Sequence, residues 1–251
     1  MIKIKSPAEL ERMRASGRLA AQLREAVVAR VAPGVTTREL DAYAREWLAQ
    51  HGARSAFLGY RGYPGCICIS VNDEVVHGIG GDRQVLMGDL VSLDFGVSYE
   101  GYVGDTAKTV LVGALQPESL HLVQTAEAAL QAGIAAARPG NHVGDIGHAV
   151  EQVARRARMS VVRDFVGHGV GRHLHEDPQV PNYGRPGQGA RLRPGMTLAI
   201  EPMLNRGGAA VRVLADGWTV VTRDGSLSAH CEHTVAIGPE GPEILTCTAA
   251  N

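Results

Sequence analysis

Leu90 to Val112, LVSLDFGVSYEGYVGDTAKTVLV, reads as two strand-like runs joined by the turn SYEG. We expect the turn to be centred between Tyr99 and Glu100. Asp94 and Asp105 are equidistant from that centre, so they should face each other directly across the hairpin. Side chains in that relation have Cβ atoms about 4.5–5.5 Å apart. Two carboxylates so close repel each other, and the pKa of one is raised unless a counter-charge lies nearby.

The Asp94–Asp105 pair can be accommodated in several ways. Protonation of one carboxylate, a neighbouring Lys or Arg, or outward splaying into water would each relieve the repulsion. A divalent cation bound between the two side chains would relieve it as well. The hairpin alone leaves these alternatives open, and the rest of the chain has to decide between them.

The composition of the chain excludes several classes of protein. Its 251 residues are 45% hydrophobic, which is enough for a packed core in one large domain or two small ones. With 25 basic and 26 acidic residues, the chain does not suggest a nucleic-acid partner or a helix that binds membrane surfaces. No apolar run reaches the ~18 residues of a spanning helix, and the start MIKIKSPAELERMR lacks the apolar core of a signal peptide. The expected location is the cytoplasm.

The two halves of the chain show the same order of features. Each reads as a helix, a Pro-Gly stop, a second helix, strands that carry His-Gly, and a strand that ends in an acid. Capping signals and Pro-Gly stops predict helices over about 7–31, 37–51, 117–137 and 145–158. Strands are expected over 66–71 and 231–237, besides the opening hairpin.

This order predicts an internal duplication. Pro139-Gly140 follows Pro33-Gly34 at an interval of 106 residues, and the run from Gly195 to Glu201 follows the run from Gly88 to Asp94 at 107. We expect one domain over 1–251, with pseudo-repeat halves of about 1–115 and 116–251. Its class should be α+β, with a central antiparallel sheet covered on one face by helices. Two independent α+β layers could mimic the pattern.

Four acids in or at the ends of expected strands are unusual, because Asp and Glu are depleted in strands and rarely buried unpaired. They are Asp94 and Asp105 in the first half and Glu201 and Glu232 in the second. A pseudo-two-fold axis would bring them together, and His168 in the Gly-rich turn VGHGVGR adds an imidazole. Four carboxylates and one imidazole suit a pair of divalent cations of the Mn, Fe, Co or Zn type. The alternative for any single acid is a salt bridge or a solvated strand end.

Two further histidines are candidates for chemistry. His77 stands at the repeat position that corresponds to His168, so it should point toward the same centre. His175 precedes the turn signal Glu176-Asp177-Pro178. Each histidine taken alone is more often a hydrogen-bonded structural residue. Near a metal pair, each could donate a hydrogen bond to a substrate carbonyl or to a tetrahedral intermediate.

Five segments together resemble the signature of the type I, bacterial methionine aminopeptidases of the M24 metallopeptidase family, which have the pita-bread fold. They are SVNDEVVHGIG, LDFGVSYEGYVGDTAKT, GHGVGRHLHEDPQVPNY, LRPGMTLAIEPM and SAHCEHTV. The resemblance covers nearly the whole chain, from ELERMRASGRLA to beyond Glu232. It implies removal of the N-terminal methionine from nascent proteins, preferentially before a small second residue, by a metal-activated water at a dinuclear site.

The resemblance also assigns roles to residues of this chain. It implies that two divalent ions (Co, Mn, Fe or Zn) are held by Asp94, Asp105, His168, Glu201 and Glu232. It makes His77 and His175 substrate-binding and catalytic, and it gives a looser monovalent cation site (Na or K) at Asn72 and Ser228. The methionine pocket would be lined by Phe57, Tyr60, Tyr63, Cys68, Leu174 and Trp218. Phe57 and Leu174 stand where the family commonly has a Cys and a Phe, which puts the shape of the pocket in doubt.

A mechanistic hypothesis follows from this assignment. Asp94 chelates one metal ion, His168 and Glu201 hold the other, and Asp105 and Glu232 bridge the two. Glu201 takes the proton of the attacking water and passes it to the leaving amine. His175 polarises the scissile carbonyl, with His77 assisting.

Two other readings remain open. One is a related Xaa-Pro peptidase, although those enzymes carry a large N-terminal domain, and little chain precedes Asp94 here. The other is a non-catalytic protein that retains the fold. The 30 residues between Glu201 and Glu232 leave no room for the insertion of the type II enzymes. The expected partner is the N-terminal segment of nascent polypeptides near the ribosome. We expect a monomer with no nucleic-acid specificity and no membrane association.

Overall fold

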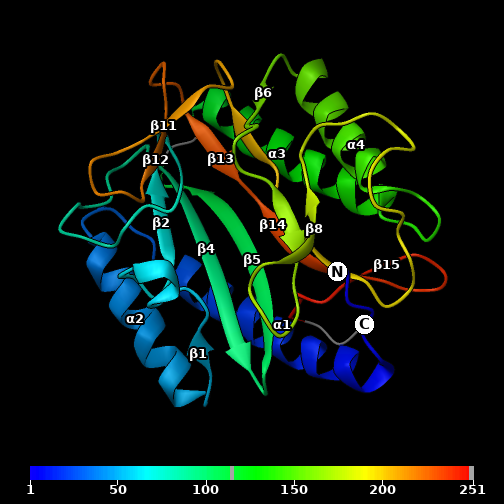
Figure 1. Cartoon of the computed structure of the whole chain (residues 1–251). Coiled ribbons are helices and arrows are strands. Elements are labelled where there is room, and N and C mark those ends of the chain that lie inside the picture. The colour runs from blue at the N-terminus through cyan, green and yellow to red at the C-terminus, as the bar shows by residue number, and fades with distance from the viewer. Residues whose placement is uncertain (114–115, 249–251) are drawn as a thin grey trace.

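The hairpin quoted above lies at the centre of the structure, a computed structural model that describes residues 1–113 and 116–248. Strands β4 (Leu90–Tyr99) and β5 (Tyr102–Leu111) pair antiparallel along their whole length. They belong to a nine-stranded sheet with the order β1-β4-β5-β14-β9-β7-β8, in which β2 also pairs with β4 and β15 with β14 (Figure 1). Every pairing in this sheet is antiparallel.

The described residues form the following elements. The helices are α1 (Pro7–Val28), α2 (Thr37–Gln50), α3 (Pro117–Ala136) and α4 (Val143–Arg156), with a 3-10 turn at Tyr60–Gly62. The remaining strands of the large sheet are β1 (Arg54–Ser55), β2 (Cys68–Val71), β7 (Gly167–Gly169), β8 (Glu176–Val180), β9 (Thr197–Ile200), β14 (Glu232–Ile237) and β15 (Pro242–Ile244). Two small sheets comprise β13 (Ser228–His230), β10 (Met203–Asn205) and β6 (Ser160–Val161), and β11 (Val211–Val213), β12 (Val220–Thr222) and β3 (Glu74–Val76).

The prediction for the hairpin is wrong, because it placed the centre of the turn one residue too early. Tyr99 pairs with Tyr102, so the central residues of the turn are Glu100 and Gly101, at φ 49° and 79°. Two positive φ angles define a type I′ turn, for which Gly is well suited. The expected centre would have forced the bulky Tyr99 into that region.

As a consequence, Asp94 and Asp105 do not oppose each other directly. Asp94 pairs with Ala107 and Asp105 pairs with Gly96. The two aspartates are therefore diagonal neighbours on one face of the hairpin, where Cα atoms are separated by about 7–8 Å rather than 5 Å.

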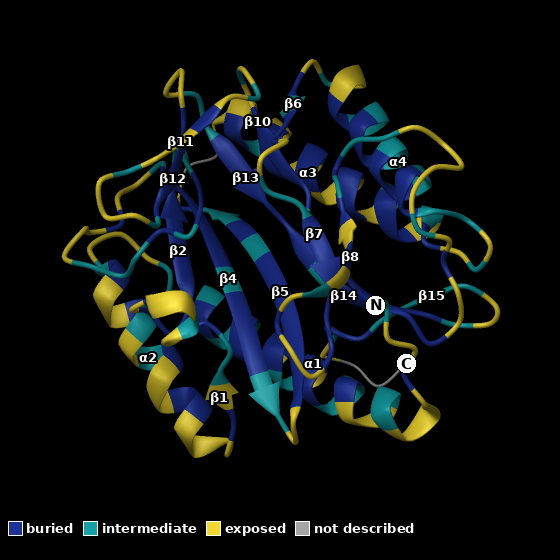
Figure 2. Ribbon diagram, viewed as in Figure 1, coloured by how far each residue is buried: buried dark blue, intermediate teal, exposed yellow. Residues whose placement is uncertain are grey.

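The helices cover one face of the sheet and the acids lie on the other. Leu93 and Phe95 of β4 pack with side chains of α1 and α2, whereas Asp94 points to the opposite face because side chains alternate along a strand. Val235 and Ile237 of β14 likewise pack with α3 and α4, and Glu232 lies on the opposite face. The helix pairs α1/α2 and α3/α4 lie at two ends of the molecule, and their sheet-facing sides are buried (Figures 1 and 2). The α+β class with an antiparallel sheet is confirmed.

The two halves of the chain meet where β5 pairs with β14. This seam contains only the pairs Ala107–Glu232 and Thr106–His233. Threonine hydroxyls extend it: Thr106 Oγ1 donates to the carbonyl of Glu232 over 2.8 Å, and Thr234 Oγ1 bonds both backbone groups of Asp105 at 2.8 and 2.9 Å. The boundary expected between the halves adjoins residues 114–115, which lie outside the described residues, and the single-domain expectation stays a prediction.

Helix α4 begins two residues before its expected start. His142 occupies the N-cap, and its backbone N–H donates to the Asp145 carboxylate over 2.7 Å. Asp145 is thus the third residue of the helix, where an acid caps the N-terminus and favours the helix dipole. In the described residues, we find no helix with the length and apolarity needed to span a bilayer.

Replacing Gly104 with Ala is expected to destabilise the fold by about 1–3 kcal/mol through overpacking. Helix α1 crosses β5 so closely that a Cβ at Gly104 would lie 2.7 Å from both Cα and N of Gly17. Urea unfolding of the metal-free variant would measure the effect. Gly81→Ala serves as the control, because the nearest atom to its added Cβ is 3.9 Å away. Equal urea midpoints for Gly104→Ala and Gly81→Ala would contradict this expectation and would show that α1 can move away from β5 at little cost.

Candidate metal centre

A cavity of about 370 Å³ opens on the sheet face opposite the helices. Its floor carries all the residues that the sequence singled out as ligands, and its walls carry the expected substrate-binding residues. The site residues that line it are Asp94, Asp105, His168, Glu201, Glu232, His77, His175, Phe57, Tyr60, Tyr63, Cys68, Leu174 and Trp218.

The pairing of four strands explains why these acids converge. Asp94 on β4 pairs with Ala107 on β5, which in turn pairs with Glu232 on β14. The register between β14 and β9 places Glu201 beside Glu232, one step beyond the pair His233–Ile200. The acids therefore form a short row across the sheet, with both halves of the chain contributing.

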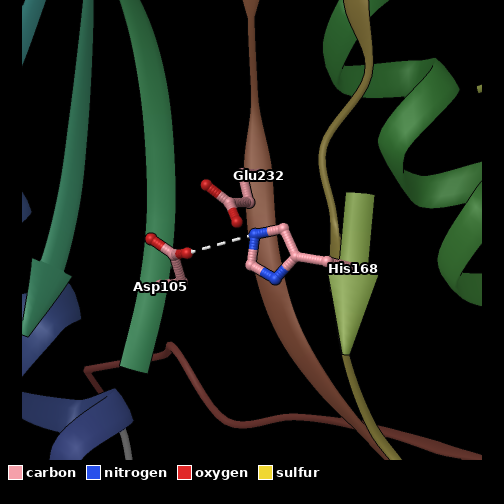
Figure 3. Close-up of side chains that lie close together, drawn as sticks. All are labelled: Asp105, His168 and Glu232. Carbon is pink, nitrogen blue, oxygen red and sulfur yellow. Dashed lines mark ion pairs between the residues drawn. The ribbon is translucent and has the colours of Figure 1, made fainter. Parts of the chain in front are cut away.

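The innermost group of the site is Asp105, His168 and Glu232. Each offers a ligand atom within 4.8 Å of the other two, and all three side chains point toward one another (Figure 3). The Nε2 atom of His168 lies 3.6 Å from Asp105 Oδ2 and 3.4 Å from Glu201 Oε1. Asp105, His168 and Glu232 are all buried, with exposures of 3%, 7% and 2% respectively.

The orientation of the His168 ring favours metal binding. Its Nδ1 lies 2.9 Å from the carbonyl oxygen of Gly169, which can only accept, so Nδ1 carries the proton. Burial lowers the pKa of His168 to about 3, so the ring is neutral at pH 7. Nε2 then presents a lone pair to the carboxylate oxygens of Asp105 and Glu201. Facing lone pairs repel each other unless a cation lies between them, and a hydrogen bond at the distal nitrogen is typical of metal-ligating histidines.

The four carboxylates have few compensating partners among the described residues. Burial raises the pKa of Asp94 to about 7 and raises the pKa values of Asp105, Glu201 and Glu232 well above their ordinary range, with mutual repulsion adding to the effect for the last three. Asp94 Oδ1, Asp105 Oδ1 and Glu232 Oε1 are buried without a hydrogen bond, and within the described residues no Lys or Arg forms an ion pair with the four acids. Unpaired buried carboxylates are costly, so this donor set fits divalent cations of the Mn, Fe, Co or Zn type.

The apolar part of the cavity adjoins the acidic floor. Cys68 pairs with Asp94 across β2 and β4, and Tyr63 lies edge-on to Trp218 with ring centroids 5.1 Å apart. The Tyr63 hydroxyl donates to the carbonyl oxygen of Gly78 over 2.8 Å, which leaves its ring as an apolar wall. Phe57 lies flat on Gly96, where an added Cβ would be 2.5 Å from its ring. A long apolar side chain can therefore be held next to the ligands.

The two candidate histidines lie on the walls of the same cavity. The His175 Nδ1 atom is 2.8 Å from the Tyr60 hydroxyl, and its ring centroid is 4.2 Å from that of His168. His77 has a φ of 62° and meets Phe165 and Trp218 edge-on. Burial lowers the pKa of His77 to about 4 and also lowers that of His175, so both rings are neutral near pH 7 and can donate one N–H.

The side chains expected at a monovalent cation site have protein partners. Asn72 bonds the Asp89 carboxylate and the Leu90 backbone N–H, each over 2.9 Å. The Ser228 hydroxyl donates to Asn205 Oδ1 over 2.9 Å, and its backbone N–H donates to the Asn72 carbonyl. The two residues are thus adjacent, and the cation site stays a prediction.

Several residues of the site were not found from the sequence. Arg61, Asp164, Phe165, Val166 and Gln179 also line the cavity. His230 lies behind Glu201, with Nε2 3.8 Å from Glu201 Oε2. Its signal was present in the segment SAHCEHTV, because His230 stands two residues before Glu232 and alternation predicts the same side of the chain.

Comparison with known proteins is consistent with this geometry. The model of metallopeptidase family M24 matches residues 11–239. The chain is 48% identical to methionine aminopeptidase 1 of Bacillus subtilis over 98% of its length and 99% of that protein. It superimposes on the crystal structure of methionine aminopeptidase from Rickettsia prowazekii with a TM-score of 0.97 at 42% identity, covering 98% and 100% of the two chains. For the enzyme of Thermotoga maritima the TM-score is 0.96 at 45% identity, covering 98% and 99%.

Proposed function

Because the chain belongs to metallopeptidase family M24, and is therefore a metal-dependent hydrolase, we propose that it removes the N-terminal methionine from polypeptides whose second residue is small. The observation that carries this proposal is the direct contact between an acidic floor and an apolar pocket in one cavity. An aminopeptidase substrate offers a positively charged amine next to its first side chain. The cavity offers carboxylates for the amine and an apolar wall for a methionine side chain.

We assign the metal ligands to Asp94, Asp105, His168, Glu201 and Glu232, which together provide enough donors for two divalent ions. Bound metal ions of this type supply Lewis acidity, which lowers the pKa of a water molecule to near 7. Asp105 and Glu232 would be the ligands shared between the two ions, since each offers a donor atom within 4.8 Å of the other and of His168.

The remaining steps belong to the protein side chains. Glu201 accepts the proton of the attacking water and returns it to the leaving amine. His175, held by Tyr60, donates a hydrogen bond to the scissile carbonyl, and His77 assists from the opposite wall. The pocket formed by Phe57, Tyr60, Tyr63, Cys68, Leu174 and Trp218 holds the methionine side chain.

The part of the substrate chain beyond its first residues would extend out of the site through an outer cavity of about 550 Å³. This cavity shares Arg61, Val166, His168, His175 and Gln179 with the inner one and is further lined by polar residues such as Lys3, Glu176 and Asp177. An open exit suits a long chain rather than a dipeptide. It supports action on long polypeptides, and we propose that these are nascent chains in the cytoplasm, close to the point where they emerge during synthesis.

A peptide panel tests the proposed function. Metal-stripped protein refilled with Mn²⁺, Fe²⁺, Co²⁺ or Zn²⁺ in turn should release methionine from Met-Ala-Ser. It should act at least about tenfold more slowly on Leu-Ala-Ser, whose branched first side chain differs in shape from the methionine that the pocket is proposed to hold. A similar loss is expected for Met-Leu-Ser, because its second side chain is larger than the small one proposed. N-acetyl-Met-Ala-Ser, which lacks the free amine, should resist cleavage. Faster turnover of an Ala-Pro peptide than of Met-Ala-Ser would instead identify an Xaa-Pro peptidase.

A further inference from the structure

His230 is a buried histidine, with an exposure of 1%. Within the part of the chain that the structure describes, neither Nδ1 nor Nε2 of its ring has a hydrogen-bond partner. A neutral imidazole always carries one N–H, and a buried donor without an acceptor costs about 1–3 kcal/mol. A native protein rarely retains such a group without a use for it.

The backbone around His230 fixes the direction of the ring. The backbone N–H of His230 donates to Thr109 Oγ1 over 2.9 Å, and the same hydroxyl donates to the carbonyl of His230 over 2.8 Å. On the other side, His230 pairs with Met203 in the small sheet of β13 and β10. The strand is therefore held on both sides, and Nε2 lies 3.8 Å from Glu201 Oε2.

Glu201 consequently lies between two imidazoles. His168 Nε2 is 3.4 Å from Oε1, and His230 Nε2 is 3.8 Å from Oε2. The two rings differ in what they can offer. His168 uses its N–H on the carbonyl of Gly169, so it presents a lone pair, whereas His230 has an N–H that no other group accepts.

We propose that His230 is the positioning residue of Glu201, donating its Nε2–H to Oε2 so that Oε1 stays directed toward His168 and the metal ligands. This inference rests on the proposed function, which makes Glu201 a ligand and the general base. The present separation exceeds a hydrogen-bond length by roughly 0.6–1 Å. The terminal torsion of the glutamate has a broad energy well, so its rotation can bring Oε2 closer to Nε2 of His230.

The proposed hydrogen bond would orient a carboxylate that binds metal. Loss of such a hydrogen bond typically lowers metal affinity about 10–100-fold. His230→Leu removes both nitrogens with a similar side-chain volume, and His230→Gln retains an N–H donor. Calorimetric titration of metal-free protein with Mn²⁺ should show about 10–100-fold weaker binding for the Leu variant and recovery of most of the affinity for the Gln variant. With saturating metal, kcat on Met-Ala-Ser should fall in the Leu variant while KM changes less than about twofold.

The matched control is His233→Leu on the adjoining strand. The Nδ1 atom of His233 lies 2.8 Å from Thr246 Oγ1, so this histidine has a partner that is not a ligand. Its substitution should leave Mn²⁺ affinity unchanged even if the melting temperature falls. Wild-type Mn²⁺ affinity in His230→Leu would overturn the inference, whatever its melting temperature.

The two proposals can fail separately. If wild-type protein binds Mn²⁺ but releases no methionine, the proposed function fails, and the titration still decides the role of His230. If the Leu variant does not fold, His230→Asn takes its place, since its shorter side chain should not reach Glu201. If His230→Asn bound Mn²⁺ as tightly as His230→Gln does, the inference would be overturned.

Discussion

Glu201→Gln is expected to lower kcat on Met-Ala-Ser by about 10²–10⁴-fold, the usual contribution of a positioned general base. Glutamine retains the shape of the side chain, so the cavity and the place of His168 beside it should persist. It cannot take up the proton of the attacking water, and it removes a negative charge from the ligand set. Initial rates at saturating Mn²⁺ and at several peptide concentrations would measure the loss.

Glu151→Gln is the matched control for this experiment. Glu151 is another buried glutamate, on α4, and its carboxylate pairs with Arg155 and Arg163 at 3.1 and 2.7 Å, away from the cavity. Its substitution should lower stability and leave kcat unchanged. If Glu201→Gln retains activity within about tenfold of wild type, Glu201 is not the base.

Asp105→Asn is expected to have two effects of opposite sign. It removes a ligand from the innermost group, so metal affinity and activity should be lost almost entirely. The same change should stabilise the metal-free protein. The pKa of Asp105 is raised in the folded state by burial and by Asp94, so at neutral pH the acid opposes folding. A neutral amide carries no such cost, so we expect the free energy of unfolding of the metal-free variant to exceed that of the metal-free wild type.

Thermal unfolding in the presence of a chelator would show the gain as a higher melting temperature for the variant than for wild type. Adding Mn²⁺ should raise the melting temperature of wild type by mass action and leave the variant unchanged. Asp89→Asn provides the contrast. Asp89 is also buried, but it accepts hydrogen bonds from Asn72 Nδ2 and from the Leu86 backbone N–H, so the same substitution should destabilise the protein. A lower melting temperature for metal-free Asp105→Asn would contradict the proposed repulsion.

Local signals in the sequence predicted the elements well where a short-range cause sets them. The start of α1 follows from the capping box of Ser6 and Glu9, and its Pro7 occupies the first helical position, as expected. The start of α4 was misplaced because Asp145 was read as the first residue of the helix rather than as its third. The hairpin was displaced for a similar reason, since the positive φ of Gly101 outweighed the symmetry of the two aspartates.

Convergence of the acids was predicted from the repeat, although the contacts themselves could not be. No local pattern states that β14 inserts between β5 and β9, because that order depends on packing between distant segments. The repeat argument rested on the spacing of Asp94 and Glu201 behind Gly88 and Gly195, and the duplication itself stays a prediction. It missed His230 because the first half offers no counterpart for comparison, and because its partner Glu201 is distant in sequence.

The short seam between β5 and β14 implies that metal ions bound at the proposed site would also affect how the two halves are held together. Only two residue pairs and a few threonine hydroxyls join the halves there, whereas the β4–β5 hairpin is paired along its full length. Asp94 and Asp105 lie on one side of this narrow joint, and Glu232, Glu201 and His168 lie on the other. Divalent ions held by both sets, as proposed above, would cross-link β5 and β14 over this short joint. Without them, two sets of like charges would face each other across it, so such ions would also stabilise the packing of the two halves against each other.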